Sequence, residues 1–411
     1  MSLVKHNWST MFFTNFLGVF NDNFLKHSII FIAITWKLPV WLTQSQLISL
    51  VAAALVIPYL LFSPLAGKWA VRHSKQKIWQ LFKLLELPIM IVASIAFLFE
   101  MAGLAVFSVL LMGIQSAMYS PSKYGLIRDV EGPSGVSFGS GLFETMAFLG
   151  ILIGSVAAPF LSDHYNVWIL IGTFLGVALI GYFASRRLRI HELPEEHIHS
   201  VTINPIKFIK QSHQFAANYK YLNSAVLGSS IFWMIGGMLQ MNVVVYTVGH
   251  LKTTNSVSGI LLCCAAVGIA LGCTAAGLLS KKTVVPRMIP LGLIGMIVSI
   301  LPLVVFASIS VWLVGFLIFM FAFMGGFFEV PSMALVQHAN FGRKLGEMIA
   351  YVNLVNFLFI LVGTGLFSMT MYLTSENSVA VFGVILLICL FTLLYYAVRH
   401  PEFIKGQAVL E

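Results

Sequence analysis

The side chains in this sequence that are best suited to chemistry are ionisable groups inside long apolar runs. Asp22 stands between Asn21 and Asn23, and Lys26 follows one helical turn later. An ionised side chain at the centre of a bilayer costs about 2.5 to 3.5 kcal/mol on insertion scales, so such a group is a functional candidate. Two interpretations are open: Asp22 and Lys26 neutralise each other on one helix face, or they face a cavity and bind a polar group or a proton.

A second group of candidates follows a proline. Pro121 and Gly125 flank Lys123 and Tyr124, and this pattern predicts that the helix is interrupted there, with backbone groups exposed beside a cation. Lys123 either extends to the membrane interface or contacts an anionic group of a substrate. Glu144, in the next apolar run, is either the structural partner of a nearby cation or a site residue.

The remaining polar groups in apolar runs have their own interpretations. Lys83 and Glu86 are three positions apart and are expected to neutralise each other. Glu329 lies deep in its run and is a candidate site residue or proton carrier. Gln240 and Asn242 bring amides into a Met-rich apolar segment, either as hydrogen bonds between helices or as substrate contacts.

The elements that must position these residues are long apolar helices. Of 411 residues, 59% are apolar and 9% are charged, whereas about a quarter of a soluble domain is charged. Apolar runs of roughly 20 to 25 residues have the length that crosses a bilayer. They predict twelve transmembrane helices, near 10–36, 46–66, 78–99, 104–123, 138–161, 167–185, 222–246, 257–279, 288–307, 311–336, 346–372 and 379–398.

The charges follow the loops of this assignment. Nineteen of the twenty-four Lys and Arg fall on one side, whereas Lys37 and Lys252 fall on the other. Positive-inside bias therefore predicts that both termini and the central basic stretch are cytoplasmic. The net charge of +9 does not indicate a nucleic-acid partner, because that needs a basic face on a soluble domain. The first apolar run is too long for a cleavable signal peptide and is expected to remain as a helix.

The four cysteines carry no metal or disulfide pattern. All four lie in apolar segments without ligand or framework spacing, so they are expected to be packing residues, and we expect no metal or cofactor. They are Cys263, Cys264, Cys273 and Cys389.

A constant shift of about 210 residues superimposes landmarks of the two groups of six helices. Gly18 falls on Gly228, Gly67 on Gly277, Pro121 on Pro331 and Ser122 on Ser332. Such repetition indicates an internal duplication. We expect a first half at 1–185, a cytoplasmic linker at 186–220 and a second half at 221–411.

The two halves differ in their polar groups. Under the same shift the run Asn21–Asn23 meets Ile231–Trp233, Lys26 meets Gly236 and Lys123 meets Met333. We therefore expect the polar groups in one half only. A cavity with one charged wall and one apolar, aromatic wall suits an amphipathic molecule better than a sugar or a free ion.

Two six-helix halves in parallel repeat, joined by a basic linker, are typical of the major facilitator superfamily. The loop Gly67–Lys75 resembles the signature of that superfamily, with Val71 where an acid is usual. Five further runs together resemble the lysophospholipid transporter family within it: Phe16–Asn23, Tyr119–Gly125, Gly141–Glu144, Ser230–Trp233 and Gly325–Pro331.

This resemblance implies movement of lysophospholipids, chiefly lysophosphatidylethanolamine, across the bacterial inner membrane to the cytoplasmic leaflet for reacylation. Asp22, Lys123 and Glu144 match polar positions of the family, whereas Gln240 replaces a family arginine. The expected site holds a zwitterionic headgroup among these residues and Asn21, Asn23 and Tyr124, with the acyl chain on the second half. A monomer working with a separate cytoplasmic acyltransferase is expected.

Other function classes remain as alternatives. One is a proton-coupled transporter of another amphipathic solute, with Asp22, Glu144 or Glu329 as the titrating group. A receptor or assembly factor lacks a soluble domain to signal through. Some relatives carry a fused acyltransferase, whose chemistry needs a His and an Asp separated by four residues, and no aspartate here has a histidine five positions before it. We therefore expect no enzyme activity.

Overall fold

The regular structure of this chain is helical throughout the residues that the structure, a computed structural model, describes. These are residues 3–32, 36–37, 44–132, 135–163, 165–192, 202–280, 284–306, 309–339 and 344–405. Part of the predicted linker, 193–201, and the loop residues Lys281, Lys282 and Arg343 lie outside them.

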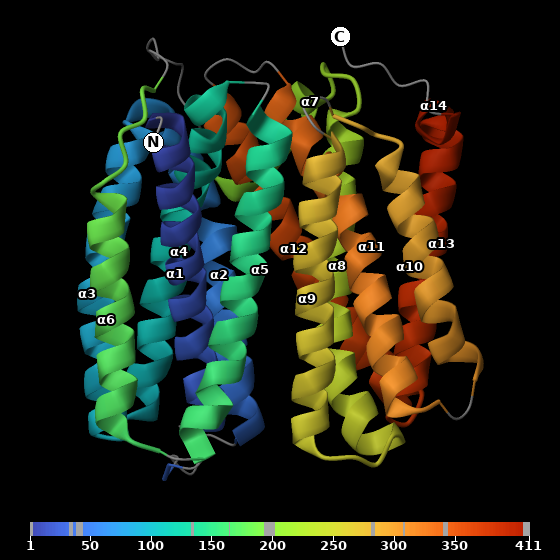
Figure 1. The fold of residues 1–411 in the computed structure, drawn as a ribbon, viewed down its shortest axis with the longest axis horizontal. Helices are drawn as coiled ribbons and strands as arrows, with labels where there is room; N and C mark the ends of the chain where they lie inside the picture. The colour runs from blue at the N-terminus through green and yellow to red at the C-terminus, as the bar shows by residue number, and fades with distance from the viewer. Residues whose placement is uncertain are drawn as a thin grey trace. The chain divides into compact units, whose positions relative to one another are not determined.

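Twelve long helices appear close to the predicted ranges (Figure 1). The first six are α1 (Leu3–Phe31), α2 (Gln44–Arg72), α3 (Lys75–Leu98), α4 (Ala102–Glu131), α5 (Val136–Asp163) and α6 (Val167–Ser185). The other six are α8 (Leu222–Val245), α9 (Asn255–Ser280), α10 (Met288–Val305), α11 (Val311–His338), α12 (Leu345–Leu373) and α13 (Ser378–Arg399). A π-helical turn, Tyr246–His250, extends α8, and the short helix α14 spans Pro401–Lys405.

Eleven of the described helices are long and apolar enough to cross a bilayer, and α1 is not among them. Its 29 residues reach about 43 Å at 1.5 Å per residue, which is more than a hydrocarbon layer needs. The polar residues that make α1 a functional candidate are also the ones that lower its hydropathy. The fold is an all-α membrane fold of twelve long helices, eleven of which have the length and hydropathy of a membrane span.

The predicted interruption at Pro121 and Gly125 is wrong. Helix α4 runs without a break from Ala102 to Glu131 and ends at Gly132, whose φ is 74°. Pro331, the repeat mate of Pro121, lies inside α11 in the same way. A proline removes one backbone hydrogen bond, and tight packing around a buried span tolerates that loss. Pro121 and Gly125 are both buried, as are most of their neighbours in α4.

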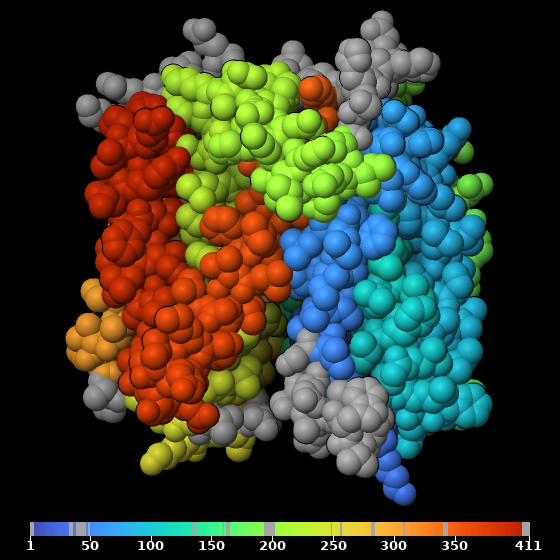
Figure 2. Space-filling view, turned by 180° about the vertical axis from the view of Figure 1, so that it is seen from behind, coloured from blue at the N-terminus to red at the C-terminus, as the bar shows by residue number. Residues whose placement is uncertain are grey.

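The predicted linker contains a helix that its polar composition did not indicate. Helix α7 spans Pro205–Ala216, and it buries Phe208, Ser212 and Ala216 on one face. His213 Nδ1 lies 3.3 Å from the Tyr351 hydroxyl. Figure 2 shows the yellow-green atoms of this segment next to the orange atoms of α12. Helix α7 therefore packs against α12 and is not an extended connection.

The described chain forms two compact units. Unit 1 comprises 1–132, 149–215 and 340–354, and unit 2 comprises 133–148, 216–339 and 355–411. The first part of α5 therefore belongs to unit 2, and the first part of α12 belongs to unit 1.

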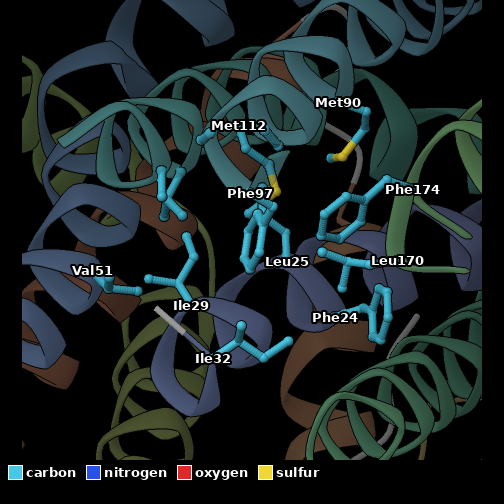
Figure 3. Packing of buried hydrophobic residues seen from close by; sticks show 14 of the residues in the cluster. Phe24, Leu25, Ile29, Ile32, Val51, Met90, Phe97, Met112, Leu170 and Phe174 are labelled. Carbon is cyan, nitrogen blue, oxygen red and sulfur yellow. The ribbon is translucent and has the colours of Figure 1, made fainter. Parts of the chain in front are cut away.

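The apolar core of unit 1 fixes the position of α1. Phe24 packs against Phe174 of α6 with ring centroids 5.3 Å apart, and Phe97 of α3 lies 5.8 Å from the same ring. Leu25 and Ile29 of α1 are fully buried in this cluster (Figure 3). Because the buried part of this core begins at Phe24, two residues after Asp22, it fixes the orientation of the adjacent polar part of α1.

Candidate functional site

Asp22 of α1 lies in a polar cluster inside unit 1. Its carboxylate accepts a hydrogen bond of 2.8 Å from the Ser116 hydroxyl of α4. Lys83, Glu86 and Lys123 lie within electrostatic reach of it. Among the described residues, the structure records no ion pair between Asp22 and Lys26. The carboxylate is turned toward α4 instead of along its own helix.

The predicted pair of Lys83 and Glu86 is confirmed and is deeply buried. The ammonium and carboxylate lie 2.6 Å apart, and each side chain is 1% exposed. Asn21 Nδ2 donates to the other carboxylate oxygen of Glu86 at 2.7 Å. The ammonium of Lys83 occupies space that a side chain at Gly18 would need. Asn21 is fully buried, so its amide is committed to holding α1 against α3.

Lys123 points into the same polar region from α4. Its ammonium donates to Asn15 Oδ1 of α1 at 3.2 Å. The rings of Tyr119 and Tyr124 lie 5.3 and 5.4 Å from it, within the range of a cation–π interaction. Lys123 is 9% exposed, so it is buried in unit 1.

The other two candidates on α1 are Asn23 and Lys26, and they lie outside the hydrogen-bonded cluster. Asn23 Nδ2 donates to the Val19 carbonyl of its own helix at 2.9 Å, and its Cβ lies close to Gly154 of α5. Lys26 is half-buried, and no hydrogen bond or ion pair of its side chain is recorded within the described part of the chain. These two side chains therefore carry no contact that fixes a role for them.

Unit 2 contains a second buried polar network, centred on Glu329 of α11. The Ser229 hydroxyl of α8 donates to Glu329 Oε1 at 2.8 Å. Asn356 of α12 donates to the Ser229 hydroxyl at 3.3 Å and accepts from the Ser230 hydroxyl at 2.7 Å. Glu329 is 1% exposed. The side chains thus form a chain of hydrogen bonds from α12 through α8 to a buried carboxyl group.

Glu144 of α5 lies beside this network. It is buried, and it is within electrostatic reach of Glu329. One turn further along α5, Phe148 stacks on Trp233 of α8 with ring centroids 5.8 Å apart and meets Phe232 edge-on at 6.2 Å. Two candidate carboxyl groups and three aromatic rings are therefore brought together within unit 2.

The two amides of α8 have different environments. Asn242 is fully buried and donates to the Ser378 carbonyl of α13 at 3.0 Å, which confirms its interpretation as a hydrogen bond between helices. Gln240 is exposed, and no hydrogen bond of its side chain is recorded among the described residues. Only one of the two amides is therefore held by a neighbouring helix.

The expectation that the polar groups lie in one half is wrong. The charged residues Asp22, Lys26 and Lys123 align with uncharged positions of the second half. The network of unit 2 instead consists mainly of the neutral polar residues Ser229, Ser230 and Asn356. A usable signal was present: Asn353 and Asn356 place two amides three positions apart in an apolar run. Asn353 donates to the Ser120 hydroxyl of α4 at 2.9 Å within unit 1, so the two amides serve different units.

Comparison with known proteins gives consistent matches. The model of the Major Facilitator Superfamily matches residues 9–364. The lysophospholipid transporter LplT of Klebsiella pneumoniae subsp. pneumoniae is 29% identical over 385 residues, covering 90% of this chain and 89% of that protein. LplT of Escherichia coli O1:K1 is 29% identical over 380 residues, with 90% and 89% covered.

Solved structures show the same fold. The transporter FucP in its outward conformation superimposes with a TM-score of 0.71 at 14% identity, covering 100% of both chains. The human organic anion transporter MFSD10 gives a TM-score of 0.74 at 14% identity, covering 96% of this chain and 99% of that one. At this level of identity the likeness concerns the fold alone.

Proposed function

Because the chain belongs to the Major Facilitator Superfamily and is a membrane transporter, we propose that it moves lysophospholipid across the bacterial inner membrane by alternating access. Lysophosphatidylethanolamine is the substrate that we assign. Relatives that share 29% of their residues with it are lysophospholipid transporters by name. Movement across the membrane delivers the lysolipid to a separate cytoplasmic acyltransferase, and the transporter acts as a monomer.

The observation that supports this substrate is the presence of Asp22 and Lys123 in one polar cluster. The two side chains lie within electrostatic reach of each other. A phosphoethanolamine headgroup carries an ammonium and a phosphate, so it needs one anionic and one cationic contact. Asp22 is the acceptor for the ammonium and Lys123 is the donor for the phosphate. Asn21 has the role of a positioning residue, since its amide is bound to Glu86.

The aromatic residues of unit 2 suit the remaining part of such a substrate. Phe148, Phe232 and Trp233 pack together and offer a surface for an acyl chain. Glu144, one turn before Phe148 on α5, is a further polar group of unit 2 that we assign to substrate binding. Gln240 is exposed on α8, and its neutral amide is a further polar contact that we assign to substrate binding.

Reconstituted vesicles test the proposal. Labelled lysophosphatidylethanolamine should cross faster with the protein than without it, and Asp22→Asn or Lys123→Ala should each lower the rate by at least about ten-fold, the loss expected for one charge-assisted hydrogen bond. Glu100→Gln removes an exposed carboxylate and is the control that should transport normally. Unchanged transport with both Asp22→Asn and Lys123→Ala would reject this site.

One observation favours a second candidate function, proton-coupled transport of another amphipathic solute. Glu329 is a carboxyl group buried in a spanning helix and bound to Ser229, which is the type of group that carries protons through membranes. Glu329→Gln should then abolish the dependence of transport on a proton gradient. Dependence on the gradient without competition by lysolipid would support this candidate and would count against lysolipid as the substrate.

A further inference from the structure

A basic pocket lies at the end of unit 1 where α1 begins and α6 ends. It is a cavity of about 410 Å³ lined by His6 of α1 and by Arg186, Arg187 and Arg189, which follow α6. We call it the arginine pocket. It is distinct from the polar cluster around Asp22, because none of its lining residues belongs to that cluster.

The backbone that carries the arginines is tied to two neighbouring helices. Asn7 of α1 forms two hydrogen bonds with the backbone of Arg189, at 2.9 Å to its carbonyl and at 3.1 Å from its N–H. The N–H of Ile190 donates to Gln76 of α3 at 2.8 Å. Leu188, between the arginines, is 2% exposed. The segment is therefore fixed, and its guanidinium groups extend from a held position.

Three described acidic groups near this end of unit 1 are engaged elsewhere. Glu192 accepts hydrogen bonds from the Ser74 hydroxyl and from the first backbone N–H groups of α3. Asp129 pairs with Lys75 at 2.8 Å. Glu131 accepts from the Trp8 indole at 3.1 Å. Within the described ranges no ion pair is recorded for the three arginines.

Three guanidinium groups around one concave site match the chemistry of a phosphate. Arginine binds phosphate through two parallel hydrogen bonds, and this geometry is specific as well as strong. Among the described residues, the lining of the pocket includes no carboxylate, so none of them receives the ammonium of a zwitterionic headgroup. The chemistry therefore favours a phosphate with net negative charge.

The neighbouring surface indicates that this phosphate carries apolar chains. Helix α6 leads directly into the pocket, and its outer face exposes Leu179, Ile180 and Phe183, the last at 59%. Only 22% of the apolar window of α6 is buried within the protein, so most of this helix faces lipid. A headgroup in the pocket would place its acyl chains along that face.

We propose that the arginine pocket binds the phosphate of an anionic membrane phospholipid. This site is separate from the proposed substrate site and does not depend on the identity of the substrate. A merely basic surface attracts anionic membranes through charge alone. A specific pocket makes a further prediction. Removal of its arginines should weaken lipid binding far more than removal of the same number of positive charges elsewhere at this end of unit 1.

The purified full-length protein in detergent can be titrated with phosphatidylglycerol while bound lipid is counted by native mass spectrometry. Arg187→Ala/Arg189→Ala should weaken phosphatidylglycerol binding by at least about ten-fold, as expected for lost charge-assisted hydrogen bonds. The matched control is Arg72→Ala/Lys77→Ala, which removes two exposed charges from the neighbouring ends of α2 and α3. It should change the affinity by less than about three-fold.

Three comparisons complete the test. Phosphatidylcholine should bind weakly to every variant, and inorganic phosphate should compete poorly with phosphatidylglycerol. Equal loss in the control variant would overturn the proposal, since charge alone would then explain binding, and so would competition by inorganic phosphate at the affinity of the lipid. Arg187→Lys/Arg189→Lys keeps the charge and protects the fold. It should still lose affinity if paired hydrogen bonds matter, and full affinity would reject the pocket geometry.

Discussion

The buried ion pair of Lys83 and Glu86 holds three helices of unit 1 together. Its members lie on α3, Asn21 of α1 donates to Glu86, and the Lys83 ammonium reaches Gly18 of α1 and Gly181 of α6. Replacing a buried pair by neutral groups is often tolerated, whereas removing one partner leaves a buried charge without compensation. The pair therefore acts on the position of α1, and through it on Asp22.

Removal of one partner at a time tests this role. Lys83→Met should destabilise the protein by about 3 to 5 kcal/mol, because Asn21 is then the one described residue that still donates a hydrogen bond to the Glu86 carboxylate. The double variant Lys83→Met/Glu86→Gln should recover most of that loss, since a glutamine still accepts from Asn21 and carries no charge. Thermal unfolding of the purified variants measures both effects. A double variant that is no more stable than Lys83→Met would exclude the charge as the cause.

Sequence predicted the residues of this cluster better than their partners. Lys83 and Glu86 were paired correctly because their contact is local, three positions apart on one helix. The same rule allowed a pair of Asp22 with Lys26 as one of two interpretations, but the Asp22 carboxylate binds Ser116, 94 positions away. A hydroxyl in an apolar helix gives no sign that it faces a carboxylate, because the arrangement of helices decides the contact.

At the scale of helices, the contact between α9 and α11 depends on glycines. Gly268 and Gly272 are four positions apart on α9, and side chains at these positions would overlap the backbone of Phe319 and Phe323 in α11. On α11, Gly326 lies equally close to Gly272. Small residues at this spacing let spanning helices approach closely and gain packing energy that lipid does not offer.

Substitution of a glycine by alanine, which adds a single methyl group, tests whether this contact needs close packing. Gly272→Ala should lower the thermal unfolding temperature, because the new Cβ meets the Phe323 carbonyl and forces α9 away from α11. Gly259→Ala is the matched control in the same helix, since nothing lies within 4 Å of a Cβ there. Alanine at that site should stabilise the helix by about 0.5 to 1 kcal/mol. Equal effects of the two substitutions would contradict close packing at Gly272.

The long helices were predictable and the details of their ends and breaks were not. The range 167–185 matches α6 at both ends, since apolar composition alone defines a span. Pro121 misled because its effect depends on the packing around α4, which the sequence does not display. Helix α7 was missed because its twelve residues mix basic, polar and apolar groups and lack the long apolar run that marks the twelve long helices.

At the scale of the whole molecule, the repeat explains why the two halves carry glycines at equivalent positions. A Cβ at Gly67 of α2 would lie 2.9 Å from the Ala350 Cβ of α12, and one at Gly141 of α5 would lie 3.1 Å from the Gly277 Cα of α9. Gly67 and Gly277 are repeat mates, so each half uses a glycine of its second helix for the same kind of close approach. The shift of 210 residues predicted the equivalence, but not that α5 and α12 each divide between the two units.

The distribution of positive charges predicts the orientation of the protein in the membrane, and this orientation can be measured. We propose that both termini and the linker are cytoplasmic, because nearly all loop cations lie on that side of the assignment. In a variant whose four cysteines are replaced by serine, Lys207→Cys on α7 and Lys37→Cys after α1 place single thiols at exposed positions of opposite sides. A membrane-impermeant maleimide should label Lys37→Cys in intact cells and Lys207→Cys only after permeabilisation.

The inverse labelling pattern would show that the proposed orientation is reversed. The helices α2 to α6 lie between the two positions, and an odd number of spans places them on opposite sides, so labelling of both thiols in intact cells would contradict the assignment of spans. The expected pattern has a consequence for the arginine pocket. It places this pocket at the inner leaflet, where anionic headgroups give the surface its negative potential.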